Sequence, residues 1–185
     1  MGARGDGRAR MTARIAVLTV SDRASAGVYE DKGGPAIEAW LRRAIVSDVE
    51  ILRQIVPDGR ESVADAFRHW ADTKGADLIL ATGGTGPSPR DLTPEAMDDV
   101  VERHFPGFGE LMRAVSLREV PTAILSRQGA GTRGRCLIIT LPGKPSAIGT
   151  CLDAVFPAVP YCLDLMGAAR IETDPEVCKA FRPKK

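Results

Sequence analysis

The chain has 185 residues, which is the length of about one globular domain. Hydrophobic residues make up 44% and charged residues 26% of the sequence, as in ordinary globular proteins. The 25 Lys and Arg residues exceed the 24 Asp and Glu residues by one, and this balance argues against a dedicated nucleic-acid-binding protein, which needs a basic face.

The N-terminal residues are rich in arginine and lack the apolar stretch of a secretory signal. We therefore expect a disordered extension at residues 1–13, followed by a single domain at residues 14–185. No apolar run approaches the roughly 18 residues that span a membrane, which argues against a membrane protein. The four cysteines form no CxxC pair, and this spacing predicts reduced, mostly buried thiols of a cytoplasmic protein rather than a zinc site or a disulfide framework.

From the N-terminus, the first half of the chain alternates apolar runs typical of strands with amphipathic segments typical of helices. In chain order it predicts a strand at residues 14–20, a loop at 21–34, a helix opened by Pro35, a strand at 49–56 near an edge of the sheet, a helix with its apolar face at 63–71, a strand at 76–81, a loop at 82–92 and a helix that starts at Thr93-Pro94. The run 76–81 is apolar on both faces at its centre, which is typical of a covered parallel sheet. Thr93 is expected to cap the last of these helices, whose apolar stripe ends at His104.

The second half of the chain begins with Phe105–Phe108, whose Pro-Gly pair is expected to break the preceding helix. After it the sequence predicts a helix at residues 109–117, a short strand at 122–126, a flexible turn at 128–134, a buried strand at 136–141, a helix running toward Met166 with interruptions near Pro157 and Pro160, and a polar tail at 172–185. The alternation of strands and helices predicts an α/β fold with a parallel sheet and helices on both faces.

Three loops that follow strands carry polar or glycine-rich sequences, and in open α/β sheets ligands bind beyond the carboxyl ends of the strands. Their candidate ligand-binding residues are Ser21, Asp22, Thr82, Gly83, Gly84, Thr85, Gly86, Arg90, Gly143, Lys144, Pro145 and Ser146. Glycines let the backbone approach a ligand and direct amides at an anion, and a lysine at a helix N-terminus suits a phosphate. Each loop also has a structural explanation, namely turn and capping chemistry at 21–25, an ordinary glycine turn at 82–86 and a strand-to-helix corner at 142–146.

Two further aspartates, Asp58 and Asp91, follow separate strands. Carboxylates that meet at one sheet edge would hold Mg²⁺ against substrate phosphates, although an aspartate before a helix is also a common N-cap, which is the alternative for Asp58. The two histidines, His69 and His104, are poorly placed for general-base chemistry, and the sequence has no Gly-x-Ser-x-Gly nucleophile elbow. The residues thus indicate an anion-binding α/β domain that acts on a phosphorylated substrate with carboxylates and Mg²⁺.

Several motifs occur in a characteristic order from Ile15 to Pro183. They are Val20–Ser25, Gly27–Gly33, Thr82–Pro87, Arg90-Asp91, Thr93–Glu95, Phe105–Gly109, Ala123–Arg127, Leu141–Pro145 and Val159–Tyr161. Each motif alone has modest specificity, but their order and joint presence are highly specific for one family. In these motifs the chain resembles the Mog family of molybdopterin adenylyltransferases, which is related to the G domain of gephyrin, and it is most similar to the stand-alone bacterial type.

This resemblance implies a three-layer α/β/α sandwich with a mostly parallel central sheet, and a homotrimer in the cytoplasm. It implies a nucleotidyltransferase of molybdenum cofactor biosynthesis that transfers AMP from ATP to molybdopterin and releases pyrophosphate. ATP would be a co-substrate and Mg²⁺ would be required, with no permanently bound cofactor, and the product would pass to a molybdate-inserting protein. The family's acidic positions fall on Asp58 and Asp91, and Ser126 would line the pterin and phosphate pocket together with the two glycine-containing loops.

The resemblance also implies roles for these residues. Both aspartates are assigned to catalysis and to Mg²⁺ as candidate ligands, whereas the glycine-loop amides, Arg90 and Lys144 would neutralise phosphate charge. The chain departs from the family at Gly59, where members often have an acidic residue, and at Cys151–Pro157, which lacks an insertion of some Mog proteins. The alternative is a non-catalytic trimeric molybdopterin-binding or scaffold module of the same fold; the presence of both aspartates favours catalysis.

Overall fold

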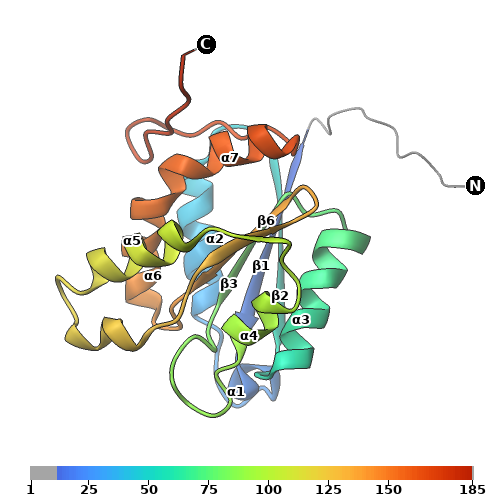
Figure 1. Ribbon diagram of the computed structural model, residues 1–185, viewed down its shortest axis with the longest axis vertical. Helices are drawn as coiled ribbons and strands as arrows, with labels where there is room; N and C mark the ends of the chain where they lie inside the picture. Colours follow the sequence, from blue (N-terminus) through green and yellow to red (C-terminus); the bar gives the residue numbers. More distant parts are fainter. Residues whose placement is uncertain (1–11, 185) are drawn as a thin grey trace, which may run out of the picture.

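The computed structural model describes residues Thr12–Lys184, so the extension expected at residues 1–13 lies outside it except for Thr12 and Ala13. The strands are β1 Ala13–Val20, β2 Val49–Val56, β3 Leu78–Thr82, β4 Arg103–His104, β5 Ala130–Arg133 and β6 Cys136–Leu141. Within the described residues they form a six-stranded sheet in the order β2-β1-β3-β6-β5-β4 (Figure 1). The four strands from β2 to β6 in this order pair in parallel, and β5 and β4 continue the sheet antiparallel.

Helices cover both faces of this sheet. They are α1 Asp22–Ser25, α2 Gly33–Ala44, α3 Arg60–Arg68, α4 Thr93–Asp98, α5 Pro106–Ser116, α6 Pro145–Val155 and α7 Val159–Met166, with the short turns η1 His69–Thr73, η2 Pro121–Leu125 and η3 Phe156–Ala158. Side chains of α2, α5, α6 and α7 share one apolar core with the sheet, and those of α3 and α4 share the other. The predicted three-layer α/β fold with a mostly parallel sheet is confirmed.

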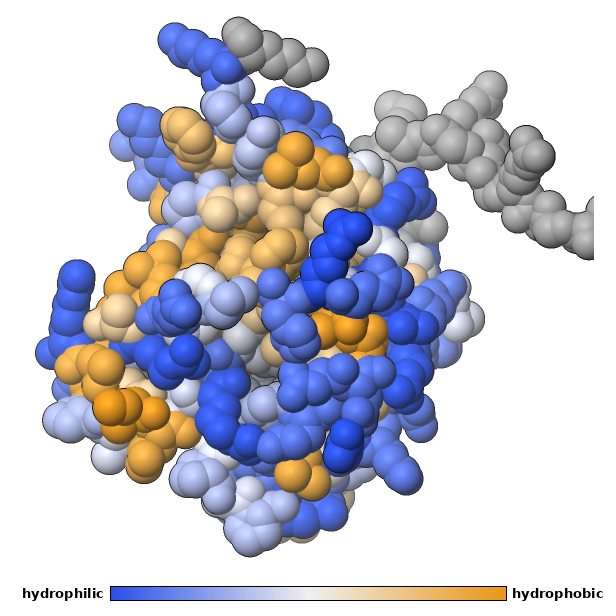
Figure 2. Space-filling view, viewed as in Figure 1, coloured by the Kyte–Doolittle hydropathy of each residue, from blue (hydrophilic) through white to orange (hydrophobic). Residues whose placement is uncertain are grey.

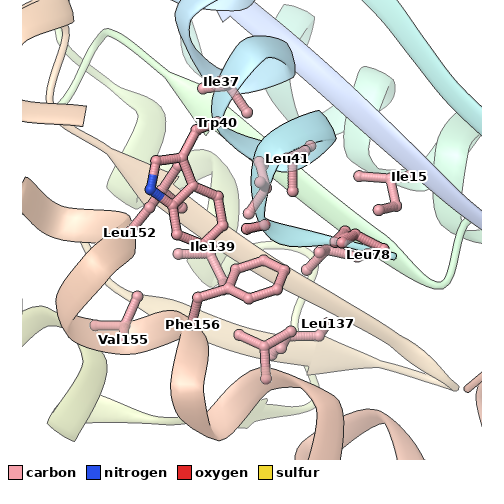
Figure 3. Packing of buried hydrophobic residues seen from close by; sticks show 14 of the residues in the cluster. Ile15, Ile37, Trp40, Leu41, Leu78, Leu137, Ile139, Leu152, Val155 and Phe156 are labelled. Carbon is pink, nitrogen blue, oxygen red and sulfur yellow. The ribbon is translucent and has the colours of Figure 1, made fainter. Parts of the chain in front are cut away.

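The alternation of side chains along β1 explains why the sheet has two covered faces. Ile15 and Val17 lie in the core that α2 and α6 cover, whereas Ala16 and Leu18 lie in the core that α3 covers, and all four are fully buried. On the first face the ring of Trp40 tilts against Phe156 with 4.8 Å between centroids (Figure 3). Burial on both faces confines β1, β3 and β6 almost entirely to apolar residues, whereas the edge strand β2 keeps exposed polar side chains such as Glu50 and Arg53.

Most of the predicted strands and the state of the cysteines are confirmed. The runs expected at 14–20, 49–56, 76–81 and 136–141 correspond to β1, β2, β3 and β6, with shifts of one or two residues at some ends, and β2 lies at the edge. The cysteines are free; Cys162 is half-buried and the other three are buried.

The stretch between α5 and β6 differs most from the prediction. Residues 122–126, expected as a strand, belong to the 3₁₀ turn η2, and residues 128–134, expected as a flexible turn, contain the buried strand β5. At Gly131 a Cβ would lie 2.8 Å from the carbonyl oxygen of Arg103 in β4, so a glycine lets the two strands approach. A glycine that serves close packing has the same sequence signal as a glycine in a turn.

Several helix boundaries were also predicted wrongly. Leu92, not Thr93, occupies the cap position of α4, and α4 ends at Asp98, so His104 lies exposed in the edge strand β4 rather than on a helical stripe. The Pro-Gly pair after Phe105 begins α5 instead of breaking a helix, because proline is favoured in a first turn. The loop expected at 21–34 contains the short helix α1 and the first turn of α2.

The segment Pro145–Met166 is, among the described residues, long and apolar enough to cross a membrane, contrary to the expectation from the sequence. It is interrupted by η3, and side chains from each of its parts, such as Ile148, Phe156 and Leu163, are buried in the core. Its apolar composition is therefore explained by its position against the sheet.

Candidate functional site

The carboxyl ends of β1, β3 and β6 lie side by side, because Thr82 of β3 is in register with both Thr19 of β1 and Leu141 of β6. The end of β2 joins them, since the Ser21 N–H donates to the carbonyl oxygen of Val56 at 2.9 Å. The loops that leave these strands therefore meet at one edge of the sheet, beside α1 and α4 (Figure 1).

The glycine-rich loop after β3 is held against its neighbours. Gly83 has φ +102°, and a Cβ there would lie 2.2 Å from the carbonyl oxygen of Val20, so the close approach of the two chains requires glycine. The Thr82 hydroxyl donates to the carbonyl oxygen of Pro142 (2.8 Å), and the Thr93 hydroxyl donates to that of Gly83 (2.9 Å). The hydroxyl of Thr93 thus fixes the loop rather than capping its own helix.

Acidic side chains lie beside this loop. The Asp22 N–H donates to Oδ2 of Asp58 (2.7 Å), and the Asp58 N–H donates to Oδ1 of Asp22 (3.0 Å). The Arg90 guanidinium donates to both carboxylate oxygens of Asp22 (2.9 and 3.0 Å) and to the main-chain oxygen of Asp58 (2.7 Å). Asp58 is therefore not the cap of α3, a position that Gly59 occupies, and its carboxylate instead joins the ends of β1 and β2.

The electrostatics of these carboxylates differ. Burial raises the pKa of the Asp58 carboxyl above its ordinary value; the Asp22 N–H opposes this rise, and the charges of Asp22 and Asp91 add to it. The hydrogen bond from Arg90 is the main cause that lowers the pKa of Asp22. Asp58 and Asp91 thus lie close enough to interact, which their spacing in the sequence did not show.

Asp91 is held by its own loop. The Ser88 N–H donates to Oδ2 of Asp91 at 2.9 Å, and a Cβ on Gly86 would lie 2.7 Å from the same oxygen. Among the described residues, Oδ1 of Asp91 and Oδ1 of Asp58 accept no hydrogen bond. Carboxylate oxygens that lack protein donors, beside a carboxyl whose pKa is raised, are hard ligands of the kind that Mg²⁺ prefers.

A cavity of about 470 Å³ opens beside Asp91. The predicted site residues that line it are Gly84, Thr85, Gly86, Asp91, Ser126, Gly143, Lys144 and Ser146. Its volume is within the range of roughly 300–1,000 Å³ that is typical of small-molecule sites. The second and third of the loops selected from the sequence therefore meet around a common space.

The cavity contains donors suited to phosphate. Lys144 occupies the cap position of the 11-residue helix α6, and within Thr12–Lys184 its ammonium makes no hydrogen bond or ion pair. The first N–H groups of such a helix attract anions. The hydroxyls of Thr85 and Ser126 lie 3.4 Å apart, and the Ser126 hydroxyl also donates to the side-chain oxygen of the buried Gln128.

The remaining predicted site residues lie outside this cavity. A smaller cavity of about 130 Å³ is lined by Ser21, Thr82, Gly83 and Pro145 among others. Gly143 borders both spaces. Asp22, Asp58 and Arg90 line neither, although Oδ1 of Asp58 would lie 3.4 Å from a Cβ on the cavity residue Gly84. Because Arg90 is engaged with Asp22, its part in neutralising phosphate stays a prediction.

Part of the cavity wall was missed by sequence reasoning. The missed residues are Pro87, Ser116, Glu119, Val120, Thr122, Ala123, Leu125, Gln128, Ala147 and Thr150, whereas Pro142 belongs to the loop 142–146 that was expected to line the pocket. Many of them belong to the end of α5 and to η2, where apolar side chains also gather on the surface, at the lower left of Figure 2. Val120 is 37% and Leu125 52% exposed, and such exposure is visible only in the structure.

Comparisons with known proteins identify the family of the chain and match its fold. The chain matches the family model described as a probable molybdopterin binding domain over residues 16–161. A molybdopterin adenylyltransferase of Helicobacter pylori is 49% identical over 94% of this chain and 99% of its own length, and a gephyrin of Dictyostelium discoideum is 38% identical over 88% of this chain and 24% of its own length. The crystal structure of the molybdopterin biosynthesis enzyme MoaB from Thermus thermophilus superposes with a TM-score of 0.79 at 42% identity, covering 87% of this chain and 100% of that one.

Proposed function

The chain belongs to the family of molybdopterin adenylyltransferases, and we propose that it transfers AMP from ATP to molybdopterin and releases pyrophosphate in the biosynthesis of the molybdenum cofactor. The similarity to the Helicobacter relative extends over nearly the whole chain. The observation that supports the site most is the cavity bordered both by Lys144 at the N-terminus of α6 and by Asp91, which interacts with Asp58. A phosphorylated substrate and acidic groups that hold a cation would meet in this space.

The reaction joins two phosphates. An oxygen of the terminal phosphate of molybdopterin forms a bond to the α-phosphorus of ATP, and the bond from that phosphorus to the oxygen bridging to the β-phosphate breaks, so pyrophosphate leaves. Transfers of this kind depend on alignment and on neutralisation of charge more than on a covalent protein intermediate. The site accordingly offers amides, hydroxyls, a lysine and carboxylates.

Each group of residues has a separate task in this proposal. Lys144 and the N–H of Ser146, which is the first in α6 because Pro145 has none, bind the phosphate of molybdopterin, and the hydroxyls of Thr85 and Ser126 bind polar atoms of the same substrate. The amides of the glycine-rich loop approach the phosphates of ATP, which glycine allows because no side chain intervenes. Asp58 and Asp91 fix the geometry of the two reacting phosphates from the acidic side of the site.

Mg²⁺ fits the donor set of this acidic side. The carboxylate oxygens of Asp58 and Asp91 without protein donors would hold it, and the pKa of Asp58 is raised by burial and further by the charges of Asp22 and Asp91. When bound, Mg²⁺ would neutralise the phosphate charge that develops during the transfer. Arg90 binds the Asp22 carboxylate, and Asp58 accepts its hydrogen bond from the main-chain N–H of Asp22.

The assembly and cellular context follow from the resemblance to the family. We expect a homotrimer in the cytoplasm, with ATP as a co-substrate, no permanently bound cofactor and transfer of the product to a molybdate-inserting protein. Sedimentation of the purified chain tests the oligomeric state, because a monomer at micromolar concentration would contradict the trimer.

The decisive assay combines purified protein, molybdopterin, ATP and Mg²⁺, and measures adenylyl-molybdopterin and pyrophosphate. We expect both products, and their loss when ATP or Mg²⁺ is omitted. Asp65→Asn, on the exposed face of α3, is the matched control for Asp91→Asn, because it removes a carboxylate far from the cavity. Tight binding of molybdopterin without product would instead support the binding or scaffold module. If the protein neither binds molybdopterin nor forms product, molybdopterin is refuted as the substrate.

A further inference from the structure

Arg127 follows the cavity residue Ser126 but does not itself line the cavity. Its Nε and Nη2 donate to the carbonyl oxygen of Gly86 (3.2 and 3.1 Å), and Nη2 also donates to that of Asp91 (2.5 Å). Its main-chain N–H donates to the carbonyl oxygen of Thr85 (2.8 Å). A single residue thus binds both ends of the loop that carries Asp91.

Glu95 of α4 holds the guanidinium of Arg127 in place. It lies in the first turn of α4 and forms an ion pair with Nη1 of Arg127. The hydrogen bond from Arg127 is the main cause that lowers the pKa of Glu95, so the pair is charged at neutral pH. The neighbouring residues Ala96 and Met97 are buried in the core, which makes α4 a firm support for this carboxylate.

The loop that Arg127 holds sets the place of the Asp91 carboxylate. The Ser88 N–H from the middle of the loop donates to Oδ2, and Gly86 leaves room for the same oxygen. A change in the path between Gly86 and Asp91 would therefore move the carboxylate relative to the cavity. The Arg127 guanidinium binds carbonyl oxygens of this loop and lines a separate cavity together with Arg113 and Gly129.

We infer that Arg127, braced by Glu95, is a positioning residue that holds the Gly86–Asp91 loop, and with it the Asp91 carboxylate, in the geometry required for adenylyl transfer. The inference rests on the proposed function, and it adds a task for two residues outside the cavity. It depends on the planar fork of arginine, because one guanidinium reaches two carbonyl oxygens and a carboxylate at once. A lysine ammonium keeps the charge but cannot reproduce this set of contacts.

The test uses Arg127→Lys and Glu95→Gln in the full chain. Arg133→Lys is the matched control, since Arg133 also pairs with a carboxylate, Asp72, and donates to a carbonyl oxygen, but on β5 and outside the cavity lining. For each protein we would measure kcat, the KM values for molybdopterin and for MgATP, the thermal midpoint, and hydrogen exchange of the amides in peptides covering residues 85–92.

In Arg127→Lys we expect amide exchange in residues 85–92 to become about tenfold faster, because the loop opens more readily. We expect kcat to fall by about ten- to a hundredfold, the loss that a misplacement near 1 Å produces, with the KM for molybdopterin within about threefold of the wild-type value. Glu95→Gln should also make amide exchange in residues 85–92 faster and kcat lower, but by less than Arg127→Lys does. Arg133→Lys should leave the exchange of this loop and kcat at wild-type values, and all three variants should have similar thermal midpoints.

The inference is overturned if Arg127→Lys leaves the exchange of residues 85–92 unchanged, or if its kcat falls no further than that of Arg133→Lys. A loss confined to the KM for molybdopterin also overturns it, because that result would assign Arg127 to substrate binding. If the wild-type protein makes no product, the proposed function fails, whereas the exchange measurement still decides whether Arg127 holds the loop.

Discussion

Replacement of Gly83 by alanine tests whether the glycine-rich loop has to lie against β1. A Cβ at this position would lie 2.2 Å from the carbonyl oxygen of Val20 and 3.2 Å from its carbonyl carbon, and φ is +102°. The obstacle is main chain at the end of β1, which cannot rotate aside as a side chain would. The substitution therefore combines backbone strain with a steric overlap that moves the loop or the end of β1.

The free-energy costs of the backbone strain and of the steric overlap can be estimated separately. Holding a residue other than glycine in a sparsely populated backbone region costs about 1–3 kcal/mol, and an overlap in a well-packed place adds about 1–3 kcal/mol. Gly134→Ala supplies the strain alone, because φ is +54° there and no atom lies within 4 Å of the added Cβ. For a domain of this size each kcal/mol lowers the midpoint by roughly 2–4 °C, so we expect a drop of about 10 °C for Gly83→Ala and about 3 °C for Gly134→Ala.

Thermal unfolding followed by circular dichroism measures these shifts, and adenylylation is assayed well below both midpoints. Gly83→Ala should lose most of its activity although it is folded, because Gly83 lines the smaller cavity, and a Cβ on Gly143, which borders both cavities, would lie only 3.4 Å from the Gly83 Cα. Gly134→Ala should keep wild-type activity. Equal midpoint shifts in the two variants would refute the reasoning, since the overlap with Val20 would then contribute nothing.

Three other predictions concern the charges of the site. Asp91→Asn should remain folded and lose about a hundredfold or more in pyrophosphate release at saturating Mg²⁺, because charge neutralisation by a bound metal contributes several kcal/mol; full activity would exclude a metal role for Asp91. Lys144→Met should raise the KM for molybdopterin about tenfold with a smaller effect on kcat, since a hydrogen bond to a charged group contributes about 1.5–3 kcal/mol; an unchanged KM would contradict the phosphate contact. Asp58→Asn should raise the unfolding midpoint at neutral pH in Mg²⁺-free buffer. The pKa of Asp58 is higher in the folded than in the unfolded protein, so the wild type loses stability as pH rises from the unfolded-state pKa to the folded-state pKa, and asparagine avoids this loss. This gain should vanish below the ordinary carboxyl pKa of about 3.9, and a midpoint at or below that of the wild type at neutral pH would contradict it.

Three of the four strands that the sequence predicted correctly share one physical property, whereas the half-exposed edge strand β2 was recognised from its alternating pattern. β1, β3 and β6 are buried on both faces, so nearly every residue in them is apolar, and the pattern is visible without knowledge of the neighbours. β5 has the sequence Ala-Gly-Thr-Arg and gave no such signal, because its place depends on pairing with β6 and on a glycine that admits β4. Where packing between distant segments decides the conformation, local propensity carries little information.

In the candidate site, too, the features set by local sequence were predicted and those set by packing between distant segments were missed. Its loops were found because glycine, lysine and aspartate directly after buried strands are unusual, and parallel topology brings such loops to one edge. The wall from Ser116 to Leu125 was missed because its role depends on how α5 and η2 lie against the glycine-rich loop. The interaction of Asp58 with Asp91 likewise requires the strand order β2-β1-β3, which places the ends of these strands next to one another.

The acidic edge of the site lowers stability in a way that points to its ligand. Burial is the main cause that raises the pKa of Asp58, the charges of Asp22 and Asp91 add to the rise, and Arg90, which is hydrogen-bonded to the Asp22 side chain, opposes it. An asparagine at position 58 would still accept the hydrogen bond from the Asp22 N–H, so the fold does not need the charge of Asp58. The Mg²⁺ that we propose would account for a carboxylate whose charged form the folded protein disfavours and whose structural contact a neutral residue would supply equally well. The raised pKa of Asp58 and the oxygens left without donors are both expected if the proposed Mg²⁺ binds beside the cavity.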